Sequence, residues 1–201
     1  SVREDVDTRD VNALAEARKP QSERSPNPFS VSCHAENSGL LWAGNRFWDC
    51  YSVSVSTRNT GADAVGLAFG MADEKDYFLL RWENNVRSLQ ATPLELIRVR
   101  GEERSSLGRV WVNALKDQWY SLGVATCGTR VQVFLDDAPV MDLVQPDVVI
   151  GGIGLYVEGG SEEHEAFFDD VCVEAVRRLD YTNEARLKRD ARAVEGKWDV
   201  Q

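Results

Sequence analysis

The chain has 201 residues and a formal net charge of −10, from 33 acidic and 23 basic side chains. This acidity argues against binding to nucleic acid and against adhesion to anionic membranes, because both need basic patches. No stretch approaches the roughly 20 apolar residues that cross a bilayer, so we expect no membrane insertion.

Residues 1–27 are predicted to be an extension of the folded domain. Residues 4–18 could form a short helix, but their apolar positions give only a thin stripe, and Pro20, Pro26 and Pro28 break the pattern. The charged first residues are not a signal peptide. Either the protein is cytoplasmic or its targeting segment lies outside this sequence. We expect the second case, an extracytoplasmic or secreted location, which suits an acidic surface.

Residues 28–176 alternate apolar and polar side chains in short runs separated by Gly, Asn and Asp. The clearest pair is 122–127 and 131–135, joined by a turn at Gly128 and closed by Asp136 and Asp137. About ten to twelve strands at 8–12-residue spacing predict an all-β, antiparallel β-sandwich rather than βαβ units. The expected strands are 29–33, 40–43, 50–58, 64–71, 76–82, 94–100, 109–113, 122–127, 131–135, 139–144, 150–158 and 166–176, with a charged loop at 101–106.

Residues 177–201 are again different, because they are charged and can form a helix up to about Val194. The sequence Gly196-Lys197-Trp198-Asp199-Val200 then predicts one more strand. This strand either pairs with the edge of the sandwich or begins a neighbouring repeat of the same polypeptide.

Three pairs of motifs occur in order between residues 28 and 176. They are Gly66–Phe69 with Asp76–Trp82, Trp119–Val124 with Arg130–Asp136, and Gly152–Tyr156 with Phe168–Val173. Together they resemble the laminin-G-like domains of the concanavalin A-like lectin/glucanase superfamily. The resemblance implies a concanavalin A-like jelly roll that acts as a non-catalytic interaction module, with a glycan or another protein domain as its partner.

A glycan site would need exposed aromatic rings beside polar groups, because rings stack on the apolar faces of sugars. The side chain of Trp111 is expected to point to the opposite face of its strand from Val110 and Val112, toward solvent or the concave sheet. Trp111 is therefore the first candidate. Further candidates are Trp42, Trp48 and Tyr156. The alternative for each ring is a role in the core or in covering a sheet edge.

Related sandwiches place a structural calcium near their terminal strands, so the resemblance makes Asp169 and Asp170 the candidate metal ligands. Adjacent strand residues face opposite sides, so a calcium ion there would need further ligands from elsewhere. The alternative is that an Asp at a strand end caps nearby backbone N–H groups.

We predict no enzyme activity, because the paired carboxylates of retaining glucanases are not found and the chain has only two histidines. The first alternative is a glycoside hydrolase or related sugar-cleaving enzyme of the same fold, with a carboxylate such as Asp76 or Glu165. The second is a purely structural or assembly domain whose charged ends contact neighbours.

The four cysteines, Cys33, Cys50, Cys127 and Cys172, contain no CxxC pair, so a zinc site is not expected. Two disulfides are possible, with three connectivities. Because side chains alternate between the two faces of a strand, Cys50 and Cys172 are expected on the face away from the main apolar one. They could therefore meet if their strands pair. The alternative is that the cysteines are free thiols.

Overall fold

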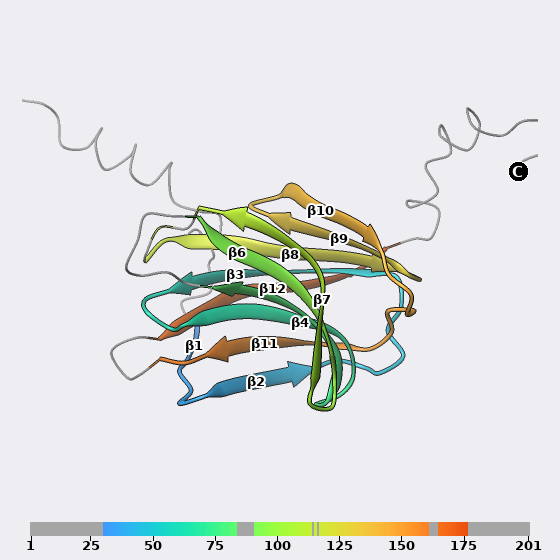
Figure 1. Cartoon of the computed structure of the whole chain (residues 1–201), viewed down its shortest axis with the longest axis horizontal. Coiled ribbons are helices and arrows are strands. Elements are labelled where there is room, and N and C mark those ends of the chain that lie inside the picture. The colour runs from blue at the N-terminus through green and yellow to red at the C-terminus, as the bar shows by residue number, and fades with distance from the viewer. Residues whose placement is uncertain (1–29, 84–90, 114, 116, 161–164, 177–201) are drawn as a thin grey trace, which may run out of the picture.

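A computed structural model describes residues 30–83, 91–113, 115, 117–160 and 165–176, which form two packed antiparallel sheets (Figure 1). Sheet A contains, in spatial order, β1 (Val31–Cys33), β12 (Ala166–Ala175), β3 (Tyr51–Asn59), β8 (Trp119–Cys127), β9 (Arg130–Leu135) and β10 (Ala138–Val144). Sheet B contains β2 (Ser38–Ala43), β11 (Gly152–Glu158), β4 (Ala64–Asp73), β5 (Asp76–Glu83), β6 (Thr92–Arg100) and β7 (Glu103–Val112). The prediction of an all-β, antiparallel sandwich is confirmed.

The described residues contain strands and turns but no helix, and therefore no helix that could cross a membrane. The predicted extensions at 1–27 and 177–201, including the strand at 196–200, lie outside the described residues. The division of the chain into these parts stays a prediction.

The hairpins follow the turn residues of the sequence closely. Gly128 has a φ of 63° between β8 and β9, where a residue without a Cβ is favoured. Asp136 and Asp137 have φ values of 49° and 63°, so they form the tight turn from β9 to β10. The expected charged loop at 101–106 is wrong, because β7 already begins at Glu103 and the turn occupies only residues 101 and 102.

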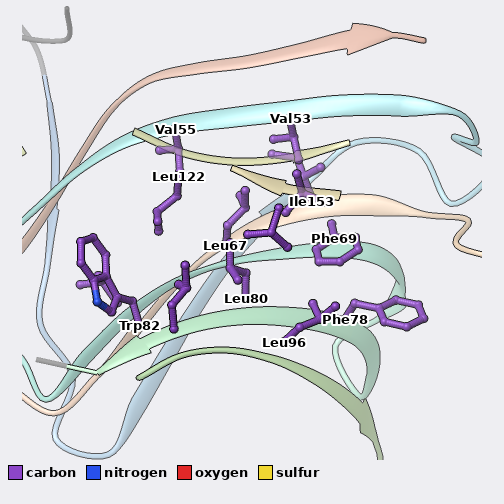
Figure 2. Close-up of a cluster of buried hydrophobic side chains, with 14 of the residues drawn as sticks. Val53, Val55, Leu67, Phe69, Phe78, Leu80, Trp82, Leu96, Leu122 and Ile153 are labelled. Carbon is purple, nitrogen blue, oxygen red and sulfur yellow. The ribbon is translucent and has the colours of Figure 1, made fainter. Parts of the chain in front are cut away.

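The core lies between the inner faces of the two sheets. In Figure 2, Val53 and Val55 of sheet A point toward Leu67 and Phe69 of sheet B. The rings of Phe69 and Phe78 stack with their centroids 5.4 Å apart. β3 and β4 alternate apolar with polar or small residues, so each presents one apolar face to the space between the sheets.

Tyr51 places a polar group inside this core. Its hydroxyl accepts a 2.8 Å hydrogen bond from the Gly70 N–H and faces the carbonyl of Gly152 at 3.4 Å. Burial raises the pKa of Tyr51 to about 12, so the hydroxyl stays neutral. One residue of β3 is thereby hydrogen-bonded to two strands of the opposite sheet.

The single disulfide among the described cysteines joins Cys50 to Cys127. Tyr51 pairs with Thr126, so the next residues outward, Cys50 and Cys127, face each other across β3 and β8. The suggested pairing of Cys50 with Cys172 is therefore wrong. Cys172 of β12 lies opposite Ser54 of β3 and is a free, exposed thiol. Cys33 is also a free thiol.

Candidate functional site

The outer face of sheet B carries a row of charged side chains. In the strand register, Arg81 of β5 lies between Gly66 of β4 and Glu95 of β6, and Glu95 lies opposite Arg109 of β7. The neighbours of Arg81 along the chain, Leu80 and Trp82, point into the core. Arg81, Glu95 and Arg109 therefore stand side by side on the face away from the core.

Arg81 holds two carboxylates on this face. Its Nε and Nη2 donate to Glu158 of β11 at 2.8 and 2.9 Å, and its Nη1 donates to Glu83 at 2.5 Å. β4 lies between β5 and β11, but Gly66 has no side chain, so the guanidinium can cross that strand. The Tyr156 hydroxyl adds a 2.8 Å hydrogen bond to Glu158.

The same contacts keep the carboxylates ionised. Hydrogen bonds from Arg81 lower the pKa of Glu158, and they outweigh the effect of burial. Burial of Glu95 would raise its pKa, but hydrogen bonds from Ser106 and from Arg109, at 2.7 Å, hold that pKa below its ordinary value. The face therefore presents fixed negative and positive groups at neutral pH.

The outer face of sheet B is concave. The Arg104 guanidinium of β7 hydrogen-bonds the Tyr156 hydroxyl of β11, although β6, β5 and β4 lie between them. In a flat sheet with strands about 4.8 Å apart this separation would be about 19 Å, farther than the two side chains reach together. Figure 1 shows the corresponding strong curvature of β6 and β7.

The middle of this concave face is filled by apolar side chains. We call them the outer cluster: Ala68, Met71, Tyr77, Leu79, Ile97, Val99 and Tyr156, all buried, with Leu40 packed against them. Among the described residues, the part of this face left open is the end of the sheet where β7 reaches Trp111. These residues therefore fill the face beneath Arg104 and leave it accessible beside Arg109.

Trp111, the first candidate from the sequence, lies at this open end. It is 65% exposed, two residues from Arg109 on the same face of β7, and it pairs with Pro93 of β6. Trp82 of β5 pairs with Leu94 of β6, so the next residue along β5, Glu83, lies beside Pro93. Pro93 therefore lies between Glu83 and Trp111. A flat ring, a carboxylate and a guanidinium thus border one patch.

The other predicted aromatic residues do not join Trp111. Trp42 is 48% exposed on the outer face of β2, at the opposite edge of sheet B. Trp48 lies in the connection from β2 to β3, where its ring makes an edge contact with Tyr51 at 6.2 Å between centroids. Tyr156 is buried in the floor of the concave face, with its hydroxyl on Glu158.

A hollow opens between the two sheets at the same end of the sandwich. It has a volume of about 320 Å³, counting the part open to solvent. The buried Thr57 Oγ1 in its wall has no hydrogen-bond partner among the described residues. The lining residues are Thr57, Asn59, Val65, Trp82, Glu83, Leu115, Gln118 and Tyr120. Glu83 thus borders both the hollow and the Trp111 patch.

A second hollow, of about 410 Å³, lies on the outer face of sheet A. Its floor consists of small residues such as Ser52, Ser54 and Gly123, and its only aromatic ring is Phe134. The fixed charges and the exposed indole ring occur together at the Trp111 patch, which is therefore the better-equipped surface for a polar ligand.

Asp169 and Asp170 lie where β12 bulges against β3. Asp170 has a φ of 49°, and its N–H is 2.7 Å from Oδ1 of Asp169. In the part of the chain that the structure describes, no group of three or more His, Cys, Asp and Glu side chains is arranged to hold a metal ion. The calcium site stays a prediction that further ligands would have to complete.

The carboxylates considered for hydrolysis lie apart from the concave face or are already paired. Asp76 forms an ion pair with Arg98 at the turn between β4 and β5. Glu165 lies 3.7 Å from Nδ1 of His34 and shares backbone hydrogen bonds with Thr60. The structure does not bring Asp76 and Glu165 together with each other or with Trp111.

Comparison with known proteins found no matching family model and no match among curated proteins. Solved structures do match. The carbohydrate-binding module CBM66 from Bacillus subtilis has a TM-score of 0.59 at 16% identity, over 74% of this chain and 92% of that chain. The Emp47p carbohydrate recognition domain has a TM-score of 0.56 at 13% identity, over 76% and 86%.

This chain has a lectin-like sandwich fold. A xylan β-1,4-xylosidase from Bacillus halodurans also contains the fold, with a TM-score of 0.55 at 11% identity over 74% of this chain and 33% of that chain. At these identities the likeness establishes the fold alone. The finer resemblance to laminin-G-like domains stays a prediction.

Arg81→Gln is expected to lower the free energy of unfolding at pH 7 by about 2 kcal/mol, because it leaves Glu158 partly buried and unpaired. The pKa of Glu158 lies below 4.5 in the folded state, so the folded chain binds fewer protons than the unfolded chain. The contribution is full above about pH 5 and is lost as the pH falls through the lowered pKa.

Urea unfolding from pH 7 to pH 3 measures this effect, with Arg46→Gln as the control. The Arg46 guanidinium lies over the ring of the exposed Phe47 and should contribute little. A gap between wild type and Arg81→Gln that is as large at pH 3 as at pH 7 would contradict the ion-pair explanation.

Proposed function

We propose that this chain is a non-catalytic carbohydrate-binding module whose site is the Trp111 patch on the outer face of sheet B. One observation carries the proposal. The exposed indole ring of Trp111 stands at the open end of a concave sheet face, beside carboxylates and guanidiniums that are already held in place. In the part of the chain described by the structure, no other element covers this ring.

The chemistry of the patch suits a sugar ring. The indole face of Trp111 can stack on the apolar C–H face of a pyranose or furanose. Glu83 can accept hydrogen bonds from sugar hydroxyls, and Arg109 can donate to them. The shallow hollow between the sheets adjoins this patch at Glu83.

The ion pairs prepare this surface for binding. Arg81 fixes Glu83, and Glu95 fixes Arg109, so these long side chains lose less freedom when a ligand arrives. Proteins that share the fold include a carbohydrate-binding module and a carbohydrate recognition domain, which supports the same class of ligand. Another protein domain remains the alternative partner.

The state of the carboxylates supports binding rather than hydrolysis. A glycosidase of the two-carboxylate type needs a general acid whose pKa is raised. Hydrogen bonds from Arg81 instead lower the pKa of Glu158. For Glu95, burial acts in the opposite direction, but the contacts with Ser106 and Arg109 outweigh it and lower the pKa. Sugar cleavage is therefore not favoured at this face.

The proposal includes a location outside the cytoplasm. The Cys50–Cys127 disulfide supports the location, because disulfides persist in oxidising compartments.

Trp111→Ala is expected to weaken glycan binding by at least about tenfold, because it removes the stacking surface while leaving the fold intact. The wild-type chain is first applied to a glycan array, and the strongest glycan is then titrated calorimetrically. Trp42→Ala is the matched control, since Trp42 is also an exposed tryptophan on sheet B but lies at the opposite edge.

Equal losses in the two variants would contradict the position of the site. An array on which the wild type binds no glycan would contradict the function and favour a structural or assembly role. Turnover of the bound glycan would instead favour the hydrolase alternative.

A further inference from the structure

One edge of sheet A is left open because β1 is short. β1 pairs with β12 at three positions only, Val31 with Phe168, Ser32 with Phe167 and Cys33 with Ala166. On its other side, β12 pairs with β3 as far as Ala175. Among the described residues, the stretch Asp170–Ala175 therefore has no strand partner on the β1 side, and its outward backbone groups are free to pair.

Apolar side chains that face the interior are exposed along this edge. Val173 pairs with the buried Val53, so its side chain lies on the inner face of sheet A, yet it is 36% exposed. Val171, two residues earlier, is 46% exposed. An inner-face valine that remains this accessible lacks a neighbour to cover it.

The opposite sheet shows the same gap. Leu41 of β2 pairs with Leu155, which pairs with the buried Leu67, so Leu41 also faces the interior. It is nevertheless 60% exposed. β1 covers only the start of β2, where Cys33 approaches Gly39. Val171, Val173 and Leu41 are thus exposed apolar side chains along the same open edge of the sandwich.

We propose that residues 197–201 of this chain occupy this open edge, as a strand added along Asp170–Ala175. Trp198 and Val200 alternate with Lys197, Asp199 and Gln201, so one face of such a strand is apolar and the other polar. The apolar face would cover Val171, Val173 and Leu41. The backbone would satisfy the free edge of β12, as in β-strand addition.

The connecting chain is long enough to return. From Val176 to Lys197 the chain advances by 197 − 176 = 21 residue steps. At about 3.3 Å each they can span about 70 Å, whereas a strand the length of Asp170–Ala175 covers only about 20 Å. A backward continuation of β1 is a poorer occupant, because Pro26 and Pro28 lack the N–H groups needed for pairing.

The charges of the connecting chain also favour its return to the edge of β12. The connection, residues 177–196, contains six basic and four acidic side chains, a net charge of 6 − 4 = +2 in a chain whose total is −10. The exposed half of β12 that they would pass carries Asp169, Asp170 and Glu174. The connection and the edge therefore attract each other, although such surface attraction is weak and screened by salt.

The test is hydrogen exchange, in the full chain, of those amides of Asp170–Ala175 that point away from β3, compared between wild type, Trp198→Ser and Lys197→Ser. We expect protection in the wild type and in Lys197→Ser, and exchange about tenfold faster or more in Trp198→Ser. The amides of β4 and β5 should remain protected in all three proteins, which shows that the sandwich itself is folded.

Light scattering at two protein concentrations identifies the source of the strand. Protection in a monomer supports pairing within one chain. Protection found only in a dimer overturns it in favour of strand exchange between two copies. If the amides that point away from β3 are unprotected in the wild type, or equally protected in Trp198→Ser, the added strand is overturned altogether.

Discussion

Phe69→Ala is expected to lower the free energy of unfolding by about 3–5 kcal/mol. The ring of Phe69 is fully buried between the sheets and stacks on Phe78, and both face the valines of β3 (Figure 2). Removing it deletes apolar contacts and leaves a cavity that the paired strands cannot close. Denaturant unfolding followed by circular dichroism measures the change.

Phe47→Ala provides the matched control, because it removes the same side chain from a position that is 70% exposed. We expect it to change the free energy of unfolding by less than about 0.5 kcal/mol. Comparable losses in the two variants would mean that the interior does not lie between the sheets as described.

Removing the Cys50–Cys127 disulfide with a double serine variant is expected to cost up to about 4 kcal/mol. The bond joins residues 77 apart, so in the chain-entropy account it removes much of the freedom of the unfolded state. The variant should still fold, since the β3–β8 ladder from Tyr51–Thr126 to Arg58–Trp119 does not depend on the sulfurs. Its melting temperature should fall and should no longer respond to reducing agent.

The double variant Cys33→Ser with Cys172→Ser is the control for this experiment. Both residues are free thiols, so the melting temperature should change little and should stay sensitive to reducing agent. A control variant that melts as early as the Cys50/Cys127 variant would contradict the assigned connectivity.

Local patterns were sufficient to predict much of the fold. The turn at Gly128 and the Asp136–Asp137 pair specify two hairpins with residues that accept positive φ values. The start of β7 was missed because Glu103 and Arg104 are charged, and charge at a chain reversal usually marks a loop. Here both residues stand on an edge strand, where charged side chains remain in solvent.

The candidate site was predicted only in part. The phase of Trp111 against Val110 and Val112 correctly indicated an outward ring. The alternation of side chains along β5 could also have predicted that Arg81 points away from the face of Leu80 and Trp82. Its partner Glu158, however, is 77 residues away in the sequence, and only the order of the strands brings the two together. Cys127 was missed as the partner of Cys50 for the same reason, because the β3–β8 register is not encoded locally.

The hydroxyl of Tyr51 has a consequence for how the two layers are aligned. Contacts between apolar side chains have little directional preference, so the packing of the core aligns the two sheets through shape alone. The hydrogen bond from Gly70 to Tyr51, with the Gly152 carbonyl facing the same oxygen, has a fixed direction and length. A shift of one sheet relative to the other would leave these buried polar groups without hydrogen-bond partners. The Tyr51 hydroxyl therefore helps to fix the alignment of the two sheets.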